Sequence, residues 1–329
     1  MQDFTDIQIK LHIYNFIISD KKLCLHMNIP VLVHHTKLQS GNELLIYQTR
    51  SYNIHTYLNA NSPGGLKNAA HIIETVDSLR IVDTFYDKVT TEEFYAYCVS
   101  LQKSIMGVFL THGHPDHYLG LEVFSRNKVL IYALQGTIRE LRRDGQRMLN
   151  QSKKMIGKAS SGKLVVPEIE ISAGMYALDS SKDGKAVKHM FNKDPSPESV
   201  IIEILEVDNI ESECQMMIWF PDTKILIAGD MFTNMVHAYI PGNRNHLDNW
   251  IAWIEKFPTF ENPALIFLGH GYPTDTCIYT KMARYLQVCR EYLVNTNINK
   301  EQYVSLLEHA FPHYTGIEMV NYYIKNYKS

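Results

Sequence analysis

The stretch THGHPDHYLG, residues 111–120, places three histidines and an aspartate within six positions, directly after the apolar run IMGVFL. A short apolar run of this kind is typical of a strand that is buried on both faces. The turn after such a strand does not hold its side chains to one face, so the four polar groups can point into one pocket. Imidazole nitrogens and carboxylate oxygens suit zinc, manganese or iron. The cluster predicts two divalent ions, with His112 and His114 at one and Asp116 and His117 at the other, and the alternative is a polar, solvated turn.

Two later apolar runs end in residues of the same chemical types. KILIAGD ends in Asp230, and ALIFLGHG carries His270 directly after its apolar part. A carboxylate and an imidazole at the C-terminal ends of buried strands can join the cluster at one edge of a sheet. This second set of side chains favours a metal site over a solvated turn.

The motifs THGHPDH, AGD and LGHG, in this order, resemble the metallo-β-lactamase superfamily over about residues 43–275. IVDT, residues 81–84, is similar to the strand that ends in an aspartate beneath the metals in that family. The resemblance implies an α/β (α+β) fold, the four-layer αββα sandwich, with a two-metal site at one edge of its sheets. It also implies Asp230 as the ligand that bridges the ions and His270 as a ligand of the second ion.

The sequence departs from the family at the third histidine of the first metal. The family places it nineteen residues before the bridging aspartate and ten before a proline, and counting back from Asp230 and from Pro221 leads in both cases to Glu211. A glutamate here resembles the alkylsulfatase-like branch of the superfamily. We therefore expect Glu211 to ligate the first metal, with Glu213 and His189 as the alternative ligands.

The pattern of apolar runs divides the chain into three parts. Residues 1–42 hold the β-prone pieces IKLHIYNFII and IPVLVHH and are expected to form an N-terminal arm outside the sandwich. Residues 43–275 alternate strands with helices and form the expected metallo-β-lactamase domain. Residues 276–329 hold three helical patterns that are expected to pack on the same domain. A helix is expected over residues 90–101 with Thr91 as its cap, and a long one over about residues 134–158.

Composition limits the classes of partner and of cellular location. The formal net charge of −3 gives no overall attraction to nucleic acid or to an anionic membrane surface. The chain has no apolar run of the roughly 18 residues that a membrane span needs, and its first residues are acidic where a signal peptide is basic. Five cysteines without a CxxC pair do not indicate a disulfide framework or a thiolate zinc site. We expect a cytoplasmic protein with a small-molecule substrate, no nucleic-acid or membrane partner, and a homodimer left open.

The resemblance and the ligand types together predict a metal-dependent hydrolase. Two divalent ions, with zinc favoured and manganese or iron left open, can share a hydroxide and lower its pKa. The expected substrate is an ester-type bond, as in an ester, thioester, lactone or sulfate ester. Asp116, His237 and Tyr272 are the candidate catalytic residues, and the segment after Asp230 is expected to form the pocket wall.

Three other functions compete with this prediction. A nuclease or phosphodiesterase of the same fold is disfavoured by the acidic net charge and by the absence of a large inserted nucleic-acid domain. Redox chemistry at two irons, as in the flavodiiron relatives, is disfavoured by His114, where those relatives usually have glutamate, and by the missing flavin domain. A binding protein with a vestigial site is disfavoured because six of the seven ligand positions are of the family's usual type.

Overall fold

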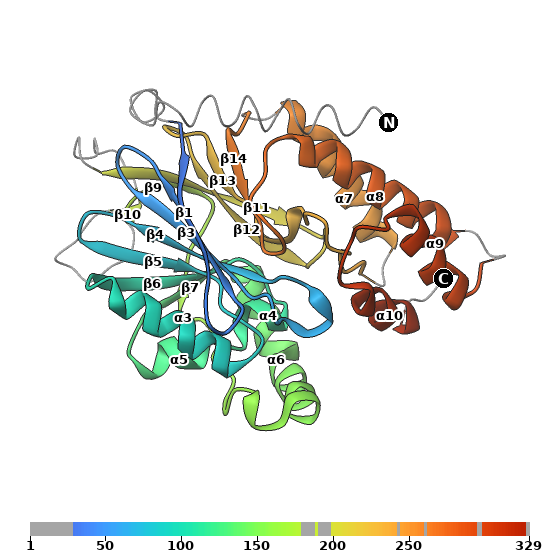
Figure 1. Ribbon diagram of the computed structural model, residues 1–329, viewed down its shortest axis with the longest axis horizontal. Helices are drawn as coiled ribbons and strands as arrows, with labels where there is room; N and C mark the ends of the chain where they lie inside the picture. The colour runs from blue at the N-terminus through green and yellow to red at the C-terminus, as the bar shows by residue number, and fades with distance from the viewer. Residues whose placement is uncertain are drawn as a thin grey trace.

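The structure, a computed structural model, describes residues 29–178, 188–189, 199–241, 244–259, 262–294 and 298–326. Two β-sheets pack face to face and are covered by helices on their outer sides (Figure 1). This arrangement confirms the predicted four-layer αββα sandwich. Among the described residues, every helix is too short or too polar to cross a membrane.

The first sheet has eight strands among the described residues, which neighbour one another in sequence order. Its first five strands form an antiparallel meander, and its last four are parallel. Its strands are β1 (Val31–Lys37), β2 (Glu43–Gln48), β3 (Asn53–Leu58), β4 (Ala69–Glu74), β5 (Ser78–Val82), β6 (Ser104–Leu110), β7 (Ile131–Ala133) and β8 (Ile169–Glu170). Parallel neighbours require crossover connections, and each of the three crossovers here contains at least one helix.

The second sheet has six strands among the described residues, in the order β10, β9, β11, β12, β13, β14. All its neighbours are antiparallel except β13 and β14, which run in parallel. Its strands are β9 (Gly174–Leu178), β10 (Lys188–His189), β11 (Val200–Asp208), β12 (Cys214–Phe220), β13 (Ile225–Ile227) and β14 (Leu265–Phe267). Strands β13 and β14 lie within the predicted apolar runs KILIAGD and ALIFLGHG.

Strand β12 shows how the sequence builds the layers. All seven residues of CQMMIWF are buried, and they alternate between two cores because successive side chains of a strand point to opposite faces. Met216 and Ile218 lie in the core between the sheets, whereas Met217 and Trp219 lie in the core under the C-terminal helices. A third core separates the first sheet from the helices on its other face. A strand of a middle layer must therefore be apolar on both faces, which explains the continuous apolar runs.

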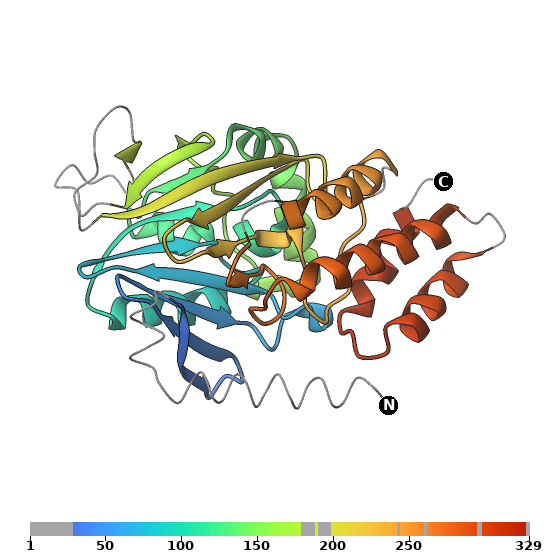
Figure 2. The same ribbon diagram turned by 90° about the horizontal axis from the view of Figure 1, so that it is seen from above.

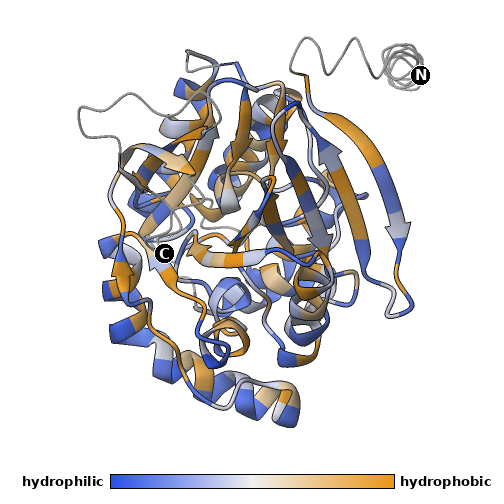
Figure 3. Cartoon of the chain, turned by 90° about the vertical axis from the view of Figure 1, so that its left-hand side faces the viewer, coloured by the Kyte–Doolittle hydropathy of each residue, from blue (hydrophilic) through white to orange (hydrophobic). Residues whose placement is uncertain are grey.

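Helices form the two outer layers (Figure 2). They are α3 (Lys88–Ser100), α4 (Pro115–Tyr118), α5 (Leu121–Arg126) and α6 (Gln135–Ile156) on the first sheet, and α7 (Arg244–Lys256), α8 (Cys277–Val294), α9 (Lys300–Ala310) and α10 (Ile317–Asn326) on the side of the second. Short 3₁₀ turns are η1 (Pro63–Gly65), η2 (Gly157–Ala159), η3 (Gly229–Met231) and η4 (Phe257–Thr259). Strands in Figure 3 are largely hydrophobic, and hydrophilic stretches gather on the outer helices.

The cap of helix α3 corrects one prediction. The side chain of Asp87, not that of Thr91, accepts the hydrogen bond from the free Thr90 N–H at the start of the helix. Thr91 lies inside the helix, fully buried, and its hydroxyl donates to the Asp87 carbonyl. The helix starts two residues earlier than predicted, because a carboxylate serves as a cap as well as a hydroxyl does.

The two ends of the described chain touch the sandwich in different ways. Strand β1 pairs with β2 and is the outer strand of the first sheet, so residues 31–37 extend that sheet. The expected β-prone piece at residues 9–18 lies outside the described residues. At the other end the Thr315 hydroxyl donates to the Gly65 carbonyl at 2.8 Å, which ties the segment before α10 to turn η1. The division at residues 42 and 275 stays a prediction.

Candidate metal centre

The predicted ligands lie at one edge of the sandwich, where strands of both sheets end. His112 to His117 follow β6 of the first sheet, and Asp230 and His270 follow β13 and β14 of the second. Parallel neighbours end at the same edge of a sheet, which brings Asp230 and His270 together. A hydrogen bond of 2.7 Å from the Met216 amide to the Thr111 carbonyl joins the two sheets here.

The first group of ligands consists of His112, His114, Glu211 and Asp230. One ligand atom from each lies within 4.8 Å of all the others. Glu211 places Oε1 2.6 Å from Nδ1 of His114 and Oε2 3.6 Å from Nε2 of His112. Two imidazoles and two carboxylates at this spacing form a donor set that suits one divalent ion.

The second group consists of Asp116, His117 and His270, whose ligand atoms also lie within 4.8 Å of one another. Asp116 Oδ2 lies 3.2 Å from Nε2 of His270 and 3.7 Å from Nε2 of His117. Asp230 Oδ2 lies 3.1 Å from Nε2 of His270, 3.4 Å from that of His117 and 3.6 Å from that of His112. Asp230 therefore faces both groups with one oxygen, as a bridging carboxylate would.

Asp83, directly after β5, orients two of the histidines. Its carboxylate accepts hydrogen bonds from the Thr111 amide at 2.8 Å, from the Thr111 hydroxyl at 2.7 Å and from Nδ1 of His117 at 3.0 Å. Because the Thr111 hydroxyl donates to Asp83, it accepts from Nδ1 of His112, at 2.9 Å. Both imidazoles are thus protonated at Nδ1 and turn the lone pair of Nε2 toward the ligand groups.

Four polar atoms in the two groups are buried and have no hydrogen-bond partner among the described residues. They are Nε2 of His112, Nε2 of His117, Oε2 of Glu211 and Oδ1 of Asp230. Unpaired polar atoms of this kind are costly inside a protein, and burial raises the pKa of Glu211 to about 7. Cations between the groups would supply the missing interactions and favour the charged carboxylates. The residues present therefore fit a pair of divalent ions.

Because Gly269 has no side chain, the ligands Asp230 and His117 can lie directly against its backbone. A Cβ atom at this position would lie 1.9 Å from Oδ1 of Asp230 and 2.9 Å from Cε1 of His117. Its neighbour His270 is held by a hydrogen bond from Nδ1 to the Leu66 carbonyl at 2.8 Å. The first glycine of the LGHG motif, Gly269, is thus required by the close approach of the ligands.

Gly269→Ala is expected to displace Asp230 and to lower both metal binding and activity, because the new methyl group has no free space. A ligand shifted by about 1 Å can cost roughly 100-fold in rate. Metal content and kcat/KM of the variant test this, with Gly162→Ala, beside the movable carboxylate of Glu122, as the control. Unchanged metal content in Gly269→Ala would show that Asp230 is not confined as described.

Glu213, one alternative to Glu211, has another partner. Glu213 is exposed and forms an ion pair with Arg143 of helix α6, with oxygen-to-nitrogen distances of 2.6 and 3.0 Å. The backbone of His189, on β10 in the second sheet, pairs with that of Tyr176. Of Glu211 and Glu213, only Glu211 is brought into the first group, and its role as a ligand stays a prediction.

Two of the candidate catalytic residues point to other partners. Nδ1 of His237 lies 3.2 Å from the Tyr285 hydroxyl, and its ring packs on Tyr314 among the C-terminal helices. The Tyr272 hydroxyl donates to Glu43 at 2.8 Å. The structure does not place His237 in either ligand group, and a catalytic role for these two residues stays a prediction that their contacts do not support.

Tyr239, in the segment after Asp230, has a side chain that contacts a predicted ligand. Its ring lies edge-on to the ring of His114, with 5.1 Å between centroids, and it also contacts Tyr323 of helix α10. Burial raises the pKa of Tyr239 to about 12, so the hydroxyl stays protonated at neutral pH and can donate a hydrogen bond. The sequence predicts that the segment with Tyr239 forms the pocket wall, but it favours His237 as the catalytic residue. The irregular segment has no periodicity that distinguishes the two residues.

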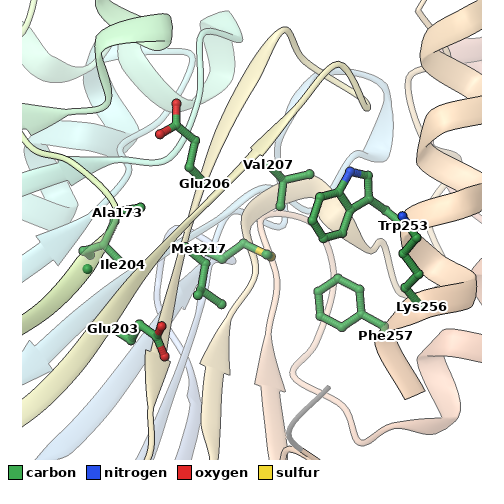
Figure 4. A pocket seen from close by; sticks show the side chains of 11 residues that line it. Ala173, Glu203, Ile204, Glu206, Val207, Met217, Trp253, Lys256 and Phe257 are labelled. Carbon is green, nitrogen blue, oxygen red and sulfur yellow. The ribbon is translucent and has the colours of Figure 1, made fainter. Parts of the chain in front are cut away.

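A separate groove of about 240 Å³ lies between β11 and helix α7 (Figure 4). Val207, Met217, Trp253 and Phe257 form its apolar wall, and the Lys256 ammonium lies 5.5 Å from the centre of the Trp253 ring. No predicted ligand lines this groove. Trp253 packs against the core under the helices.

Comparison with known proteins agrees with this architecture. Residues 64–207 match the family model described as Metallo-beta-lactamase superfamily. No curated protein matches the chain in sequence.

Solved metallo-β-lactamases share the fold at low sequence identity. The DIM-1 enzyme is 16% identical, with 77% of this chain and 99% of that chain covered and a TM-score of 0.53. The enzyme from Pontibacter korlensis is 17% identical, with 77% and 98% covered and a TM-score of 0.53. For TMB-1 the identity is 16%, the coverage 79% and 98%, and the TM-score 0.52.

Proposed function

We propose that the chain is a member of the metallo-β-lactamase superfamily, whose model matches residues 64–207, and that it is a hydrolase that uses two divalent metal ions, with zinc favoured. One observation carries the proposal. Seven side chains in two groups turn ligand atoms toward one another, and four polar atoms of these side chains are buried without a hydrogen-bond partner among the described residues. Residues kept in such a costly arrangement are expected to serve a bound cation.

Each part of the site has a defined task in this proposal. When bound, two divalent ions supply a water nucleophile that ionises near neutral pH and stabilise negative charge on a substrate oxygen. Asp230 would contribute to both ligand groups, because its Oδ2 lies close to His112 of the first group and to His270 of the second. Asp83 and Thr111 fix the orientation of His112 and His117. Tyr239, beside His114, is placed to donate a hydrogen bond to a substrate at the first group.

An ester-type bond is the proposed substrate: an ester, thioester, lactone or sulfate ester. With Glu211 in the first group, three carboxylates and one hydroxide balance the charge of two divalent ions. A neutral centre attracts polyanions less than a positive one does, and the formal net charge of the chain is −3. Both features support a neutral or singly charged substrate over a nucleic acid.

Elemental analysis of protein purified without chelator is the first test, and two metal ions per chain are expected. A panel of aryl ester, thioester, lactone, sulfate ester and phosphodiester substrates follows, each with and without prior metal removal. We expect turnover of at least one ester-type substrate, which is lost on metal removal and restored by zinc. Protein that binds no more than one ion after metal supplementation would refute the two-metal proposal, and turnover of the phosphodiester alone would refute the substrate class.

A further inference from the structure

Helix α6 places a carboxylate directly over the loop that carries the histidines. A Cβ atom on Gly113, between His112 and His114, would lie 2.5 Å from both Cδ and Oε2 of Glu140. The carboxylate therefore packs against the peptide that joins two predicted ligands. The sequence around Glu140 is polar and basic, which is typical of a solvated helix face. Only the packing of α6 on this loop reveals the contact between Glu140 and Gly113.

Glu140 has unused hydrogen-bonding capacity at this place. Its Oε2 is buried, and no described residue hydrogen-bonds it. The hydroxyl of Tyr118, in helix α4, is likewise buried and without a partner among the described residues. Burial raises the pKa of Glu140, while the nearby His114 and Arg143 lower it. Glu140 is an electrostatic neighbour of Tyr118, and an acceptor and a donor left open near each other point to a third polar group or a water between them.

His114 is the one predicted histidine ligand that lacks an outer partner in the described part of the chain. His112, His117 and His270 each use Nδ1 for such a partner and keep Nε2 for the ligand group. His114 is turned the other way, with Nδ1 2.6 Å from Glu211, so its Nε2 is the outer nitrogen. The structure describes no hydrogen bond to that nitrogen. Metal-ligating histidines almost always donate their second N–H to a carboxylate, a carbonyl or a water.

We propose that Glu140 is the positioning residue of His114: it accepts the Nε2–H of His114 through a water that it shares with the Tyr118 hydroxyl. Glu140 is an electrostatic neighbour of both His114 and Tyr118, so three polar groups are available to such a water. The carboxylate would fix the ring orientation of His114 and make it a stronger donor to the ion of the first group. This inference rests on the proposed function, since it assigns Glu140 a task only if that ion is bound.

Glu140→Leu separates a positioning role from a structural one. The substitution removes the acceptor and places an apolar side chain where a carboxylate without a partner is buried, so the metal-free protein is expected to unfold at the same or a higher temperature. Metal affinity should change in the opposite direction. We expect the dissociation constant of the first-group ion to rise about 10- to 100-fold, the usual loss when an outer partner of a ligand is removed.

The experiment uses the full chain and competition with a chromophoric chelator, with zinc and then cobalt as the probe. Glu140→Gln should give a smaller loss than Glu140→Leu, because the amide oxygen still accepts a hydrogen bond. Asp144→Asn is the matched control, since Asp144 lies one turn further along α6 and pairs with exposed Arg143 and Arg147. The absorption spectrum of bound cobalt should change in both Glu140 variants and stay the same in the control.

The outcomes distinguish the inference from the function on which it rests. If wild type binds two ions and Glu140→Leu binds both within twofold of wild type with an unchanged cobalt spectrum, Glu140 does not position His114. If wild type binds no ion, the proposed function fails together with this inference. A rise confined to one dissociation constant, with unfolding unaffected, supports the positioning role.

Discussion

Asp230→Asn is expected to cost the protein at least one of its two metal ions and to lower kcat roughly a thousandfold. The reason is that Asp230 Oδ2 is the one carboxylate oxygen that lies within 3.6 Å of Nε2 of His112, of His117 and of His270 among the described contacts. An amide has nearly the same shape but no charge, so it holds neither ion as well. Charge stabilisation by a metal is worth several kcal/mol, and about 4 kcal/mol corresponds to the stated factor.

Elemental analysis and kcat with the best substrate of the panel measure this effect. Asp208→Asn is the control, because Asp208 is exposed and carries the same charge change away from the site. Asp208 also lies with Glu206 and Cys214 in a third group of side chains with ligand atoms within 4.8 Å, so the control reports whether any ion binds there. Two ions and full activity in Asp230→Asn would show that the carboxylate does not bridge the groups.

The strand ends explain why so much of the site could be predicted from the sequence. His112, Asp230 and His270 each follow a short apolar strand that is buried on both faces, and such strands are visible as continuous apolar runs. The sandwich follows from the same runs, because a middle layer needs apolar residues on both faces. Glu211 lies in the turn between β11 and β12, where the spacing to Asp230 is set by a hairpin and one further strand. A count along the chain is therefore informative for this residue.

Contacts that depend on tertiary packing could not be predicted in the same way. Tyr239 and His237 are separated by one residue in an irregular segment, and only the C-terminal helices decide that His237 packs on Tyr285 while Tyr239 reaches His114. Glu140 has the surroundings of a solvated helix residue in the sequence. Its burial comes from the docking of α6 against a glycine 27 positions earlier in the chain, at Gly113.

Glu211→Ala is expected to weaken the ion of the first group by about 100-fold or more and to leave the ion of the second group nearly unchanged. The side chain of Glu211 is 2% exposed and places its two oxygens 2.6 and 3.6 Å from the ring nitrogens of His114 and His112. Asp116, His117 and His270, the ligands of the second group, are left untouched. Loss of one charged donor costs more than loss of an outer partner, which is typically worth about 10- to 100-fold.

Glu213→Ala is the matched control, two residues away on the same turn and with the same change in charge. Its carboxylate is paired with Arg143 at the surface, and exposed pairs contribute about 0–1 kcal/mol to stability, so metal affinity should stay within twofold. Differences in unfolding temperature between metal-loaded and metal-free protein should shrink in Glu211→Ala and persist in Glu213→Ala, because a ligand that binds only the folded state stabilises it. Glu211→His restores a nitrogen donor and should recover part of the lost affinity. If Glu211→Ala keeps both ions with wild-type affinity, Glu211 is not a ligand, and the counting argument that led to it is wrong.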